Sequence, residues 1–215
     1  DSDDRTVEIC KQYTDQVFTE TWRGYGKQKN ICAAKTQNRW ILNIDSDEVV
    51  TPESAEEIQK VMKEGPQYPV YHLPRKNYFG DRWVRFGGWY PDRILRLYDK
   101  EKVAFSETQV HERLAPDDNA GSLKNALIHY SYADREDYIQ RQDRYSTLYA
   151  QEKIANGFRA NWTHLYLRPL FAFFKNYILK QGFMDGYLGF FLAKISASYT
   201  HQKYAKTILL TDKYR

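Results

Sequence analysis

The sequence has few cysteines and no long apolar run. Cys10 and Cys32 are its two cysteines, and they match no metal-ligand spacing. We expect both thiols to be buried, in a reducing compartment. The chain contains no apolar stretch of about eighteen residues and no signal peptide, so we expect neither secretion nor a membrane span. Internal repeats and low-complexity segments are absent as well.

What is present fits a globular protein with an unusual tail. The 215 residues can form one substantial core with an appended segment. The net charge of +4 is unevenly distributed, because residues 157–215 carry nine Lys and Arg against two acids. The same segment holds fourteen aromatic residues in a chain that is already 16% aromatic. The composition therefore indicates a near-neutral body followed by a basic, aromatic tail.

The most informative segment is an apolar stretch that ends in carboxylates. Residues 40–44 have the pattern of a strand buried on both faces, as in a parallel or mixed α/β sheet, and Asp45-Ser46-Asp47-Glu48 follows. Ligands of such sheets bind beyond the carboxyl ends of the strands. Asp45 and Asp47 can each direct an oxygen toward Mg²⁺ or Mn²⁺, whose other ligands are commonly water and phosphates. The pattern predicts a metal–diphosphate site.

A simpler interpretation of these acids remains open. Carboxylates after a strand often solvate a turn or lie near the N-terminus of a helix, where the helix dipole stabilises them. A helix is expected immediately afterwards, because Thr51 is a good N-cap and Pro52 suits the first helical position.

The other segments alternate between strand and helix patterns. We expect strands at 16–18, 68–73, 93–98, 103–114 and 123–130, and helices from Val7, at 27–35, at 52–64 and from 134 onward. Pro169 should begin a further helix, and residues 182–189 should interrupt the tail. Residues 74–92 form an aromatic, glycine-rich segment that we interpret as a long loop, typical of a lid or a binding loop.

The ordered motifs resemble family 2 glycosyltransferases of the GT-A fold, most closely the bacterial lipopolysaccharide-core branch. Four passages carry the resemblance, and they span nearly the whole chain: Asp4 to Ile9, Trp22 to Asn30, Trp40 to Glu53, and Gly88 to Tyr132. The first two strands of the family are missing from this sequence, so we expect that a longer chain precedes it. The resemblance implies an α/β, GT-A-type nucleotide-sugar-binding domain with a mixed sheet over residues 1–133. A helical, basic-aromatic extension would occupy residues 134–215.

The resemblance also implies roles for residues on the donor side. Asp45 would contact the donor ribose or the metal, and Asp47 would bind the Mg²⁺ or Mn²⁺ that bridges the two phosphates. His129 would be a further metal ligand, although lone histidines are more often structural. Asp4, Lys29 and Asn30 would lie beside the donor, and Lys29 is alternatively a solvated residue on a basic helix face.

Transfer to a hydroxyl also requires a base on the acceptor side. Glu112 takes the place of the acidic base of the fold, and Asp92 is the second candidate. Each is alternatively an ion-pair partner of a neighbouring arginine. Trp83 and Trp89 can stack on the faces of acceptor sugars, or they can pack on their own domain.

The resulting expectation is a metal-dependent inverting transferase that moves a hexose from a UDP-glucose-like donor to a lipopolysaccharide inner-core acceptor. The alternatives are a transferase for capsule or protein-linked glycan, and an inactive membrane-associated binding module of the same fold. Lysines among the aromatics of the tail suit peripheral contact with the inner face of the cytoplasmic membrane, so we expect a cytoplasmic protein with a lipid-linked oligosaccharide acceptor. No motif supports binding of nucleic acid.

Overall fold

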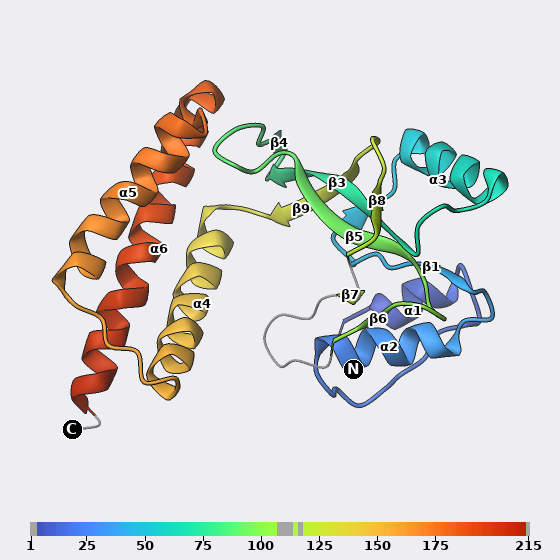
Figure 1. The fold of residues 1–215 in the computed structure, drawn as a ribbon, viewed down its shortest axis with the longest axis horizontal. Coiled ribbons are helices and arrows are strands. Elements are labelled where there is room, and N and C mark those ends of the chain that lie inside the picture. The colour runs from blue at the N-terminus through green and yellow to red at the C-terminus, as the bar shows by residue number, and fades with distance from the viewer. Residues whose placement is uncertain (1–3, 107–113, 116–117, 214–215) are drawn as a thin grey trace. The chain divides into compact units, whose positions relative to one another are not determined.

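The computed structural model describes residues 4–106, 114–115 and 118–213 (Figure 1). The chain divides into two compact units, each made of three separate segments. The first unit comprises residues 1–43, 62–72 and 95–122, and the second comprises residues 44–61, 73–94 and 123–215. Strands β3 (Val70–Phe79) and β5 (Asp92–Asp99) run from one unit into the other.

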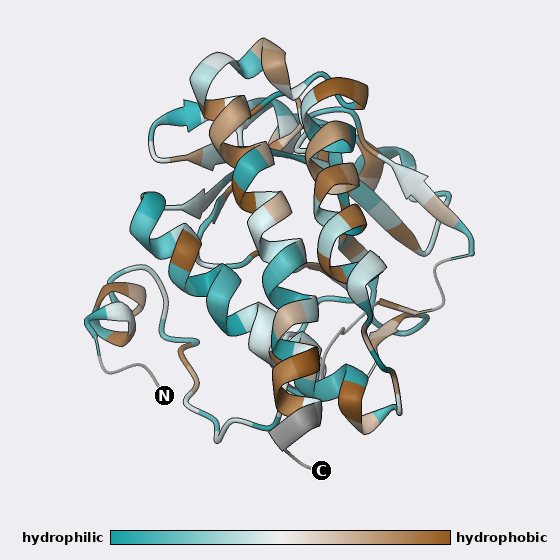
Figure 2. Ribbon diagram, turned by 90° about the vertical axis from the view of Figure 1, so that its left-hand side faces the viewer, coloured by the Kyte–Doolittle hydropathy of each residue, from teal (hydrophilic) through white to brown (hydrophobic). Residues whose placement is uncertain are grey.

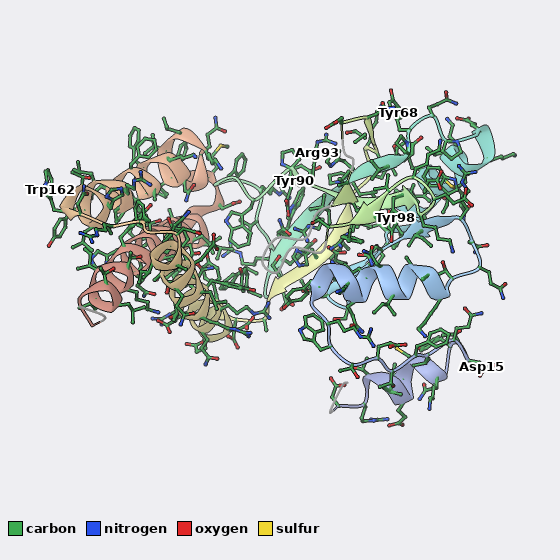
Figure 3. All side chains as sticks on the ribbon, turned by 60° about the horizontal axis from the view of Figure 1, so that its bottom comes forward. Asp15, Tyr68, Tyr90, Arg93, Tyr98 and Trp162 are labelled. Carbon is green, nitrogen blue, oxygen red and sulfur yellow. The ribbon has the colours of Figure 1, made fainter. Side chains whose placement is uncertain are left out.

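The first unit contains two complete helices and one edge of the sheet, strand β1. Its elements are α1 (Thr6–Lys11), α2 (Tyr25–Lys35), β1 (Trp40–Leu42), β6 (Ala104–Phe105), β7 (Leu114–Ala115), β8 (Ala120–Ser122) and the first-unit parts of β3 and β5. Strand β1 is antiparallel to β5, β8 is parallel to β3, and β6 and β7 form an antiparallel pair. Tyr98, labelled in Figure 3, lies in the core of this unit, where burial raises its pKa to about 12.

The second unit combines strands of the sheet with a helical region, and its strands carry a group of polar side chains. It contains β2 (Glu48–Val49), the start of α3 (Pro52–Glu64), β4 (Arg82–Trp83), β9 (Leu127–Tyr132) and the remainder of β3. Strand β3 is parallel to β9 and antiparallel to β4, and β2 is antiparallel to β9. This combination confirms the expected mixed sheet. Thr51 caps α3, because its Oγ1 accepts a hydrogen bond of 3.2 Å from the amide of Ser54.

The rest of the second unit is helical. Its elements are α4 (Arg135–Ala155), the turns η1 (Thr163–Leu167), η2 (Lys175–Leu179) and η3 (Gly182–Asp185), and the helices α5 (Arg168–Phe174) and α6 (Gly186–Lys213). The side chain of Asp134 caps α4, and Pro169 lies in the first turn of α5 as predicted. Helices α4 and α5 both pack on α6. Figure 2 looks onto this helical region and shows hydrophobic stretches along its ribbons. Within the described ranges, no helix combines the length and apolarity that crossing a bilayer requires.

Several sequence-based predictions are wrong. Residues 74–92 are only partly a loop: β3 continues to Phe79 and forms a hairpin with β4, and the loop is confined to residues 84–91 before β5. The strand can continue through the polar residues Arg75 and Asn77 because ion pairs and hydrogen bonds satisfy their side chains inside the sheet. Residues 16–18 form no strand. Cys10 and Cys32 are exposed rather than buried, because both lie on outward faces of short helices.

Other elements differ mainly in their bounds. The apolar segment at 40–44 is a strand over Trp40–Leu42 and is half-buried, because it pairs with β5 alone. In place of a strand at 123–130, β9 covers Leu127–Tyr132. Of the strand expected at 103–114, the structure forms β6 and the first residue of β7, and residues 107–113 lie outside the described ranges.

Candidate functional site

The acidic segment forms a tight turn that leads into β2. The amide of Glu48 donates to the carbonyl of Asp45 over 3.0 Å, and the amide of Tyr130 donates to the carbonyl of Asp47 over 2.9 Å. The buried carboxylate of Glu48 also accepts a hydrogen bond of 3.2 Å from the amide of Asp45. The backbone of the turn is thus held by β2 and β9, while the side chains of Asp45 and Asp47 are half-buried.

Three neighbouring strands bring polar side chains into one row. His129 on β9 lies opposite Glu48 on β2 and opposite Asn77 on β3. Residues paired across strands share a face of the sheet, so these three side chains are neighbours. Ser131 lies two residues after His129 and therefore on the same face. Its hydroxyl is 3.2 Å from the side-chain oxygen of Asn77.

The hydrogen bonds of Asn77 determine the tautomer of His129. The Nδ2 group of Asn77 donates to the carbonyl of Trp89 over 3.0 Å and to Oδ2 of Asp92 over 3.1 Å. Its Oδ1 atom therefore faces Nδ1 of His129, at 2.7 Å. Because an amide oxygen can only accept, Nδ1 carries the proton. In the neutral ring, the lone pair is then on Nε2.

This lone pair is directed at the acidic turn. Nε2 of His129 lies 3.4 Å from Oδ2 of Asp47. Burial lowers the pKa of His129, and the positive charge of Arg75 lowers it further, against the opposing effect of Asp47. A neutral imidazole nitrogen and a carboxylate oxygen that face each other form a pair of ligands of the kind that divalent cations accept. A metal-ligating histidine also commonly donates its other ring N–H to a neighbouring acceptor, as His129 does to Asn77.

Arg75 connects the acidic turn to Asp92. Its Nη1 atom lies 2.9 Å from Oε1 of Glu48, and its Nη2 and Nε atoms lie 2.6 and 3.0 Å from Oδ2 of Asp92. Asp92 therefore forms an ion pair, but with Arg75 on the adjacent strand rather than with one of its sequence neighbours. The pairs fix Asp92 in a single position next to Asn77.

Three of the residues predicted to lie beside the donor, Asp4, Lys29 and Asn30, belong to the first unit. Hydrogen bonds from the side chain of Thr6 and from its amide, the latter of 2.9 Å, lower the pKa of the Asp4 carboxyl. Lys29 lies over the ring of Phe105 at 5.1 Å. The amide of Asn30 makes two hydrogen bonds of 2.9 Å with the backbone of the same Phe105. Asn30 thus joins α2 to β6.

The two tryptophans lie in different surroundings. Trp83 meets Tyr90, labelled in Figure 3, edge-on at 5.3 Å, and the guanidinium of Arg85 lies 4.5 Å from its ring. Trp89 packs against Tyr132 and Tyr138 in the hydrophobic cluster of the second unit. Both indoles are half-buried. Trp89 thus packs on its own domain, which is one of the two alternatives given for these tryptophans.

Some residues of the site were missed or cannot be placed. Glu112 lies outside the described residues. Sequence reasoning missed Arg75, Asn77 and Ser131; Arg75 and Asn77 lie in the continuous polar run Arg75-Lys76-Asn77, which gives no strand-like alternation. In the part of the chain that the structure describes, no three His, Cys, Asp or Glu side chains form a metal site by themselves. A cation at Asp47 would therefore need substrate phosphates and water as additional ligands.

The mixed sheet with a helical C-terminal region is consistent with a GT-A type fold. Residues 1–131 match the sequence profile of glycosyl transferase family 2, and the chain belongs to this family. It is 25% identical to the lipopolysaccharide core biosynthesis glycosyltransferase LpsC of Rhizobium meliloti, over 95% of this chain and 81% of that protein.

Uncharacterized glycosyltransferases of Rickettsia have a comparable sequence identity to this chain. Those of Rickettsia felis and Rickettsia prowazekii are each 28% identical over 88% of this chain, and the similarity covers 71% and 69% of their lengths. Together with the family match, these relatives show that the chain is a transferase of glycosyl groups.

Proposed function

We propose that the protein is a metal-dependent inverting glycosyltransferase that moves a hexose from a UDP-glucose-like donor to a lipopolysaccharide inner-core acceptor. The observation that carries the proposal is the pairing of Nε2 of His129 with Oδ2 of Asp47 beside the acidic turn. The role of the Rhizobium relative in lipopolysaccharide core biosynthesis supports a lipopolysaccharide acceptor. The family supports a nucleotide-sugar donor.

The donor side would be organised by the acidic turn. Asp47 and His129 would hold Mg²⁺ or Mn²⁺, with Asp45 contacting the metal or the ribose. Bound there, the cation would offset the charge that develops on the departing nucleoside diphosphate. Asn77 keeps the proton of His129 on Nδ1, so Nε2 stays available. Asp4, Lys29 and Asn30 stay candidates for donor contacts from the first unit.

The acceptor side requires a base. A carboxylate takes the proton of the acceptor hydroxyl, whose oxygen attacks C1 of the donor sugar from the face opposite the diphosphate. The bond between C1 and the phosphate oxygen breaks, and the configuration at C1 inverts. Glu112 is the first candidate for this base. Asp92 is the second, and Arg75 and Asn77 hold its Oδ2 in place. Trp83 and Trp89 are the candidates for sugar contacts.

Peripheral contact with the inner face of the cytoplasmic membrane would bring the enzyme to a lipid-linked acceptor. The helical region exposes many large apolar side chains between η1 and the start of α6. The most exposed are Trp162, Tyr166, Leu170, Phe171, Leu179, Met184 and Tyr187. In Figure 3 the labelled Trp162 projects outward from the helices. Such a surface, flanked by lysines, suits an interface between water and lipid.

The test is Mn²⁺-dependent binding of UDP to the full-length protein, measured by calorimetry for wild type and for Asp47→Ala. The variant should lose metal-dependent binding and stay folded, because the Asp47 side chain is 41% exposed and contributes little to packing. Asp81→Ala, which removes an exposed carboxylate of the same unit, is the matched control. Unchanged Mn²⁺-dependent affinity in folded Asp47→Ala would remove the metal site from the proposal. Binding without any transfer to lipopolysaccharide acceptors would favour an inactive module instead.

A further inference from the structure

A groove with apolar walls and a cationic rim lies at the junction of the β3–β4 hairpin and the helices of the second unit. Its volume is about 540 Å³, within the usual range of ligand pockets. The apolar lining comes from the end of β3 and from one face of α6: Phe79, Tyr187, Leu188, Phe190, Phe191 and Ile195. The cations are Arg82 on β4, Arg135 at the start of α4 and Lys194 on α6.

The three cations of this groove have no carboxylate partner among the described residues, unlike several other basic residues of the chain. Arg75, Arg141 and Lys206, for example, all form ion pairs with carboxylates. Arg82, Arg135 and Lys194 are exposed, and none of their side chains makes an ion pair or a hydrogen bond with a described residue. No carboxylate is among the described residues that line the groove. Three cations from three elements therefore converge without a counter-charge from this part of the chain.

The apolar part of the groove continues into the exposed apolar surface of the helical region. Tyr187, which lines the groove, is 81% exposed. Phe183 and Met184, four and three residues earlier, are also exposed. A ligand in the groove would therefore meet apolar side chains on one side and positive charge on the other. This division matches an amphiphile with an anionic headgroup.

We infer that this groove binds one anionic phospholipid of the membrane, with the phosphate at Arg82, Arg135 and Lys194 and the acyl part along α6. The inference deepens the proposed membrane contact and rests on it, because it converts a general apolar surface into a site for a headgroup. It also links the membrane to the polar site. Phe79 of the groove lies two residues after Asn77 on β3, and Arg135 follows closely on β9, which carries His129.

The experiment uses full-length protein and a lipid short enough to be soluble without a bilayer. Dihexanoyl phosphatidylglycerol is titrated below its micellar concentration and compared with dihexanoyl phosphatidylcholine and with glycerol phosphate. Phosphatidylglycerol should bind at least tenfold more tightly than either comparison ligand. Equal binding of glycerol phosphate would reduce the groove to a phosphate site, and equal binding of phosphatidylcholine would remove the role of charge; either result overturns the inference.

Variants locate the binding. Arg82→Gln combined with Arg135→Gln and Lys194→Gln should weaken phosphatidylglycerol binding roughly a hundredfold, because each basic residue near an anionic lipid contributes about a fivefold factor. Arg144→Gln combined with Arg159→Gln and Lys175→Gln removes three exposed cations outside the lining and should change little. Tyr187→Ser tests the apolar wall without loss of core packing, and it should weaken binding of the short-chain lipid.

Failure of the inference can be separated from failure of the proposed membrane contact. Vesicles of phosphatidylglycerol and phosphatidylcholine are floated with wild type and with the groove triple variant. If the triple variant binds short-chain phosphatidylglycerol as wild type does, the groove inference is wrong even when the vesicles still recruit the protein. If sedimentation shows that wild type dimerises through the groove and the variants only break that dimer, a second copy occupies it and the inference is also wrong.

Discussion

His129 and Asp47 face each other with two hydrogen-bond acceptors, Nε2 and Oδ2, separated by 3.4 Å. Two acceptors at this distance repel each other unless a proton or a cation lies between them. Asn77 maintains the arrangement, because its Oδ1 accepts the Nδ1 proton of His129 over 2.7 Å. The side chain of Asn77 thus decides which ring nitrogen faces the acidic turn.

Replacing Asn77 should therefore weaken metal binding without removing a ligand. In Asn77→Leu the Nδ1 proton loses its nearer acceptor and keeps only the hydroxyl of Ser131, 3.0 Å away, so the ring can turn or change tautomer. We expect about a 10–100-fold loss of Mn²⁺ affinity in the presence of UDP, the usual effect of losing a residue that orients a ligand. Calorimetry gives the affinity, and Asn38→Leu at an exposed turn is the control. Wild-type affinity in a folded Asn77→Leu protein would show that Asn77 does not orient His129 for the metal.

The two candidate bases should separate in kinetics. Glu112→Gln should lower kcat by roughly 10²–10⁴-fold and leave UDP affinity nearly unchanged, since the base acts on the acceptor. Asp92→Asn should lower Mn²⁺-dependent UDP affinity as well, because it disturbs the network through Arg75 to Glu48. Initial rates with a lipopolysaccharide acceptor give kcat, and titration gives the affinity. Near-normal turnover in Glu112→Gln with a large loss in Asp92→Asn would reverse the assignment.

The sequence predicts the acidic turn well and its surroundings poorly. The carboxylates after an apolar strand are visible because they are contiguous, and helix α3 is visible because Thr51 and Pro52 mark its start. The partners of the turn come from β3 and β9, some 30 and 80 residues further along the chain. Polar residues such as Arg75 and Asn77 look like loop residues until the pairing of strands shows that they are satisfied. Exposure of Cys10 and Cys32 likewise depends on packing that a local pattern does not contain.

An ion pair in the first unit should make stability sensitive to acid. The carboxylate of Asp99 is 1% exposed, and its hydrogen bonds from Arg39 lower its pKa below the usual 3.8. A lowered pKa means that the unfolded chain binds the proton first, so this contribution is complete above about pH 3.8 and is lost as the pH falls through the lower native value. Asp99→Asn should therefore lower the Tm at neutral pH and flatten its decrease below pH 4. An equally steep decrease in the variant would contradict this assignment.

A glycine contact should control the packing of the helical region. A Cβ added at Gly189 on α6 would collide with the carbonyl oxygen of Gly182 in η3, and both are rigid backbone positions. Gly189→Ala should destabilise the protein by about 1–3 kcal/mol or more, as overpacking does, although alanine favours helices. Ser198→Ala at an exposed position of the same helix is the control. Urea unfolding gives the difference, and equal midpoints for Gly189→Ala and wild type would contradict the close approach.

The exposed apolar surface of the helices should be needed for membrane contact but not for folding. Leu170, Phe171 and Met184 are 69%, 58% and 57% exposed, so their replacement by serine removes little packing and should leave the Tm nearly unchanged. Each side chain that enters the lipid contributes up to about 1.5–3 kcal/mol, so the triple variant should lose most of its affinity for anionic vesicles. Binding of wild type should also weaken as salt rises, because attraction to charged lipid is screened over about 10 Å at 0.1 M salt. Lys175 and Lys194 supply part of that attraction, whereas Lys180 already covers Gly88 and should contribute less. Equal recovery of wild type and the serine variant in flotation would mean that the membrane contact lies elsewhere or does not occur.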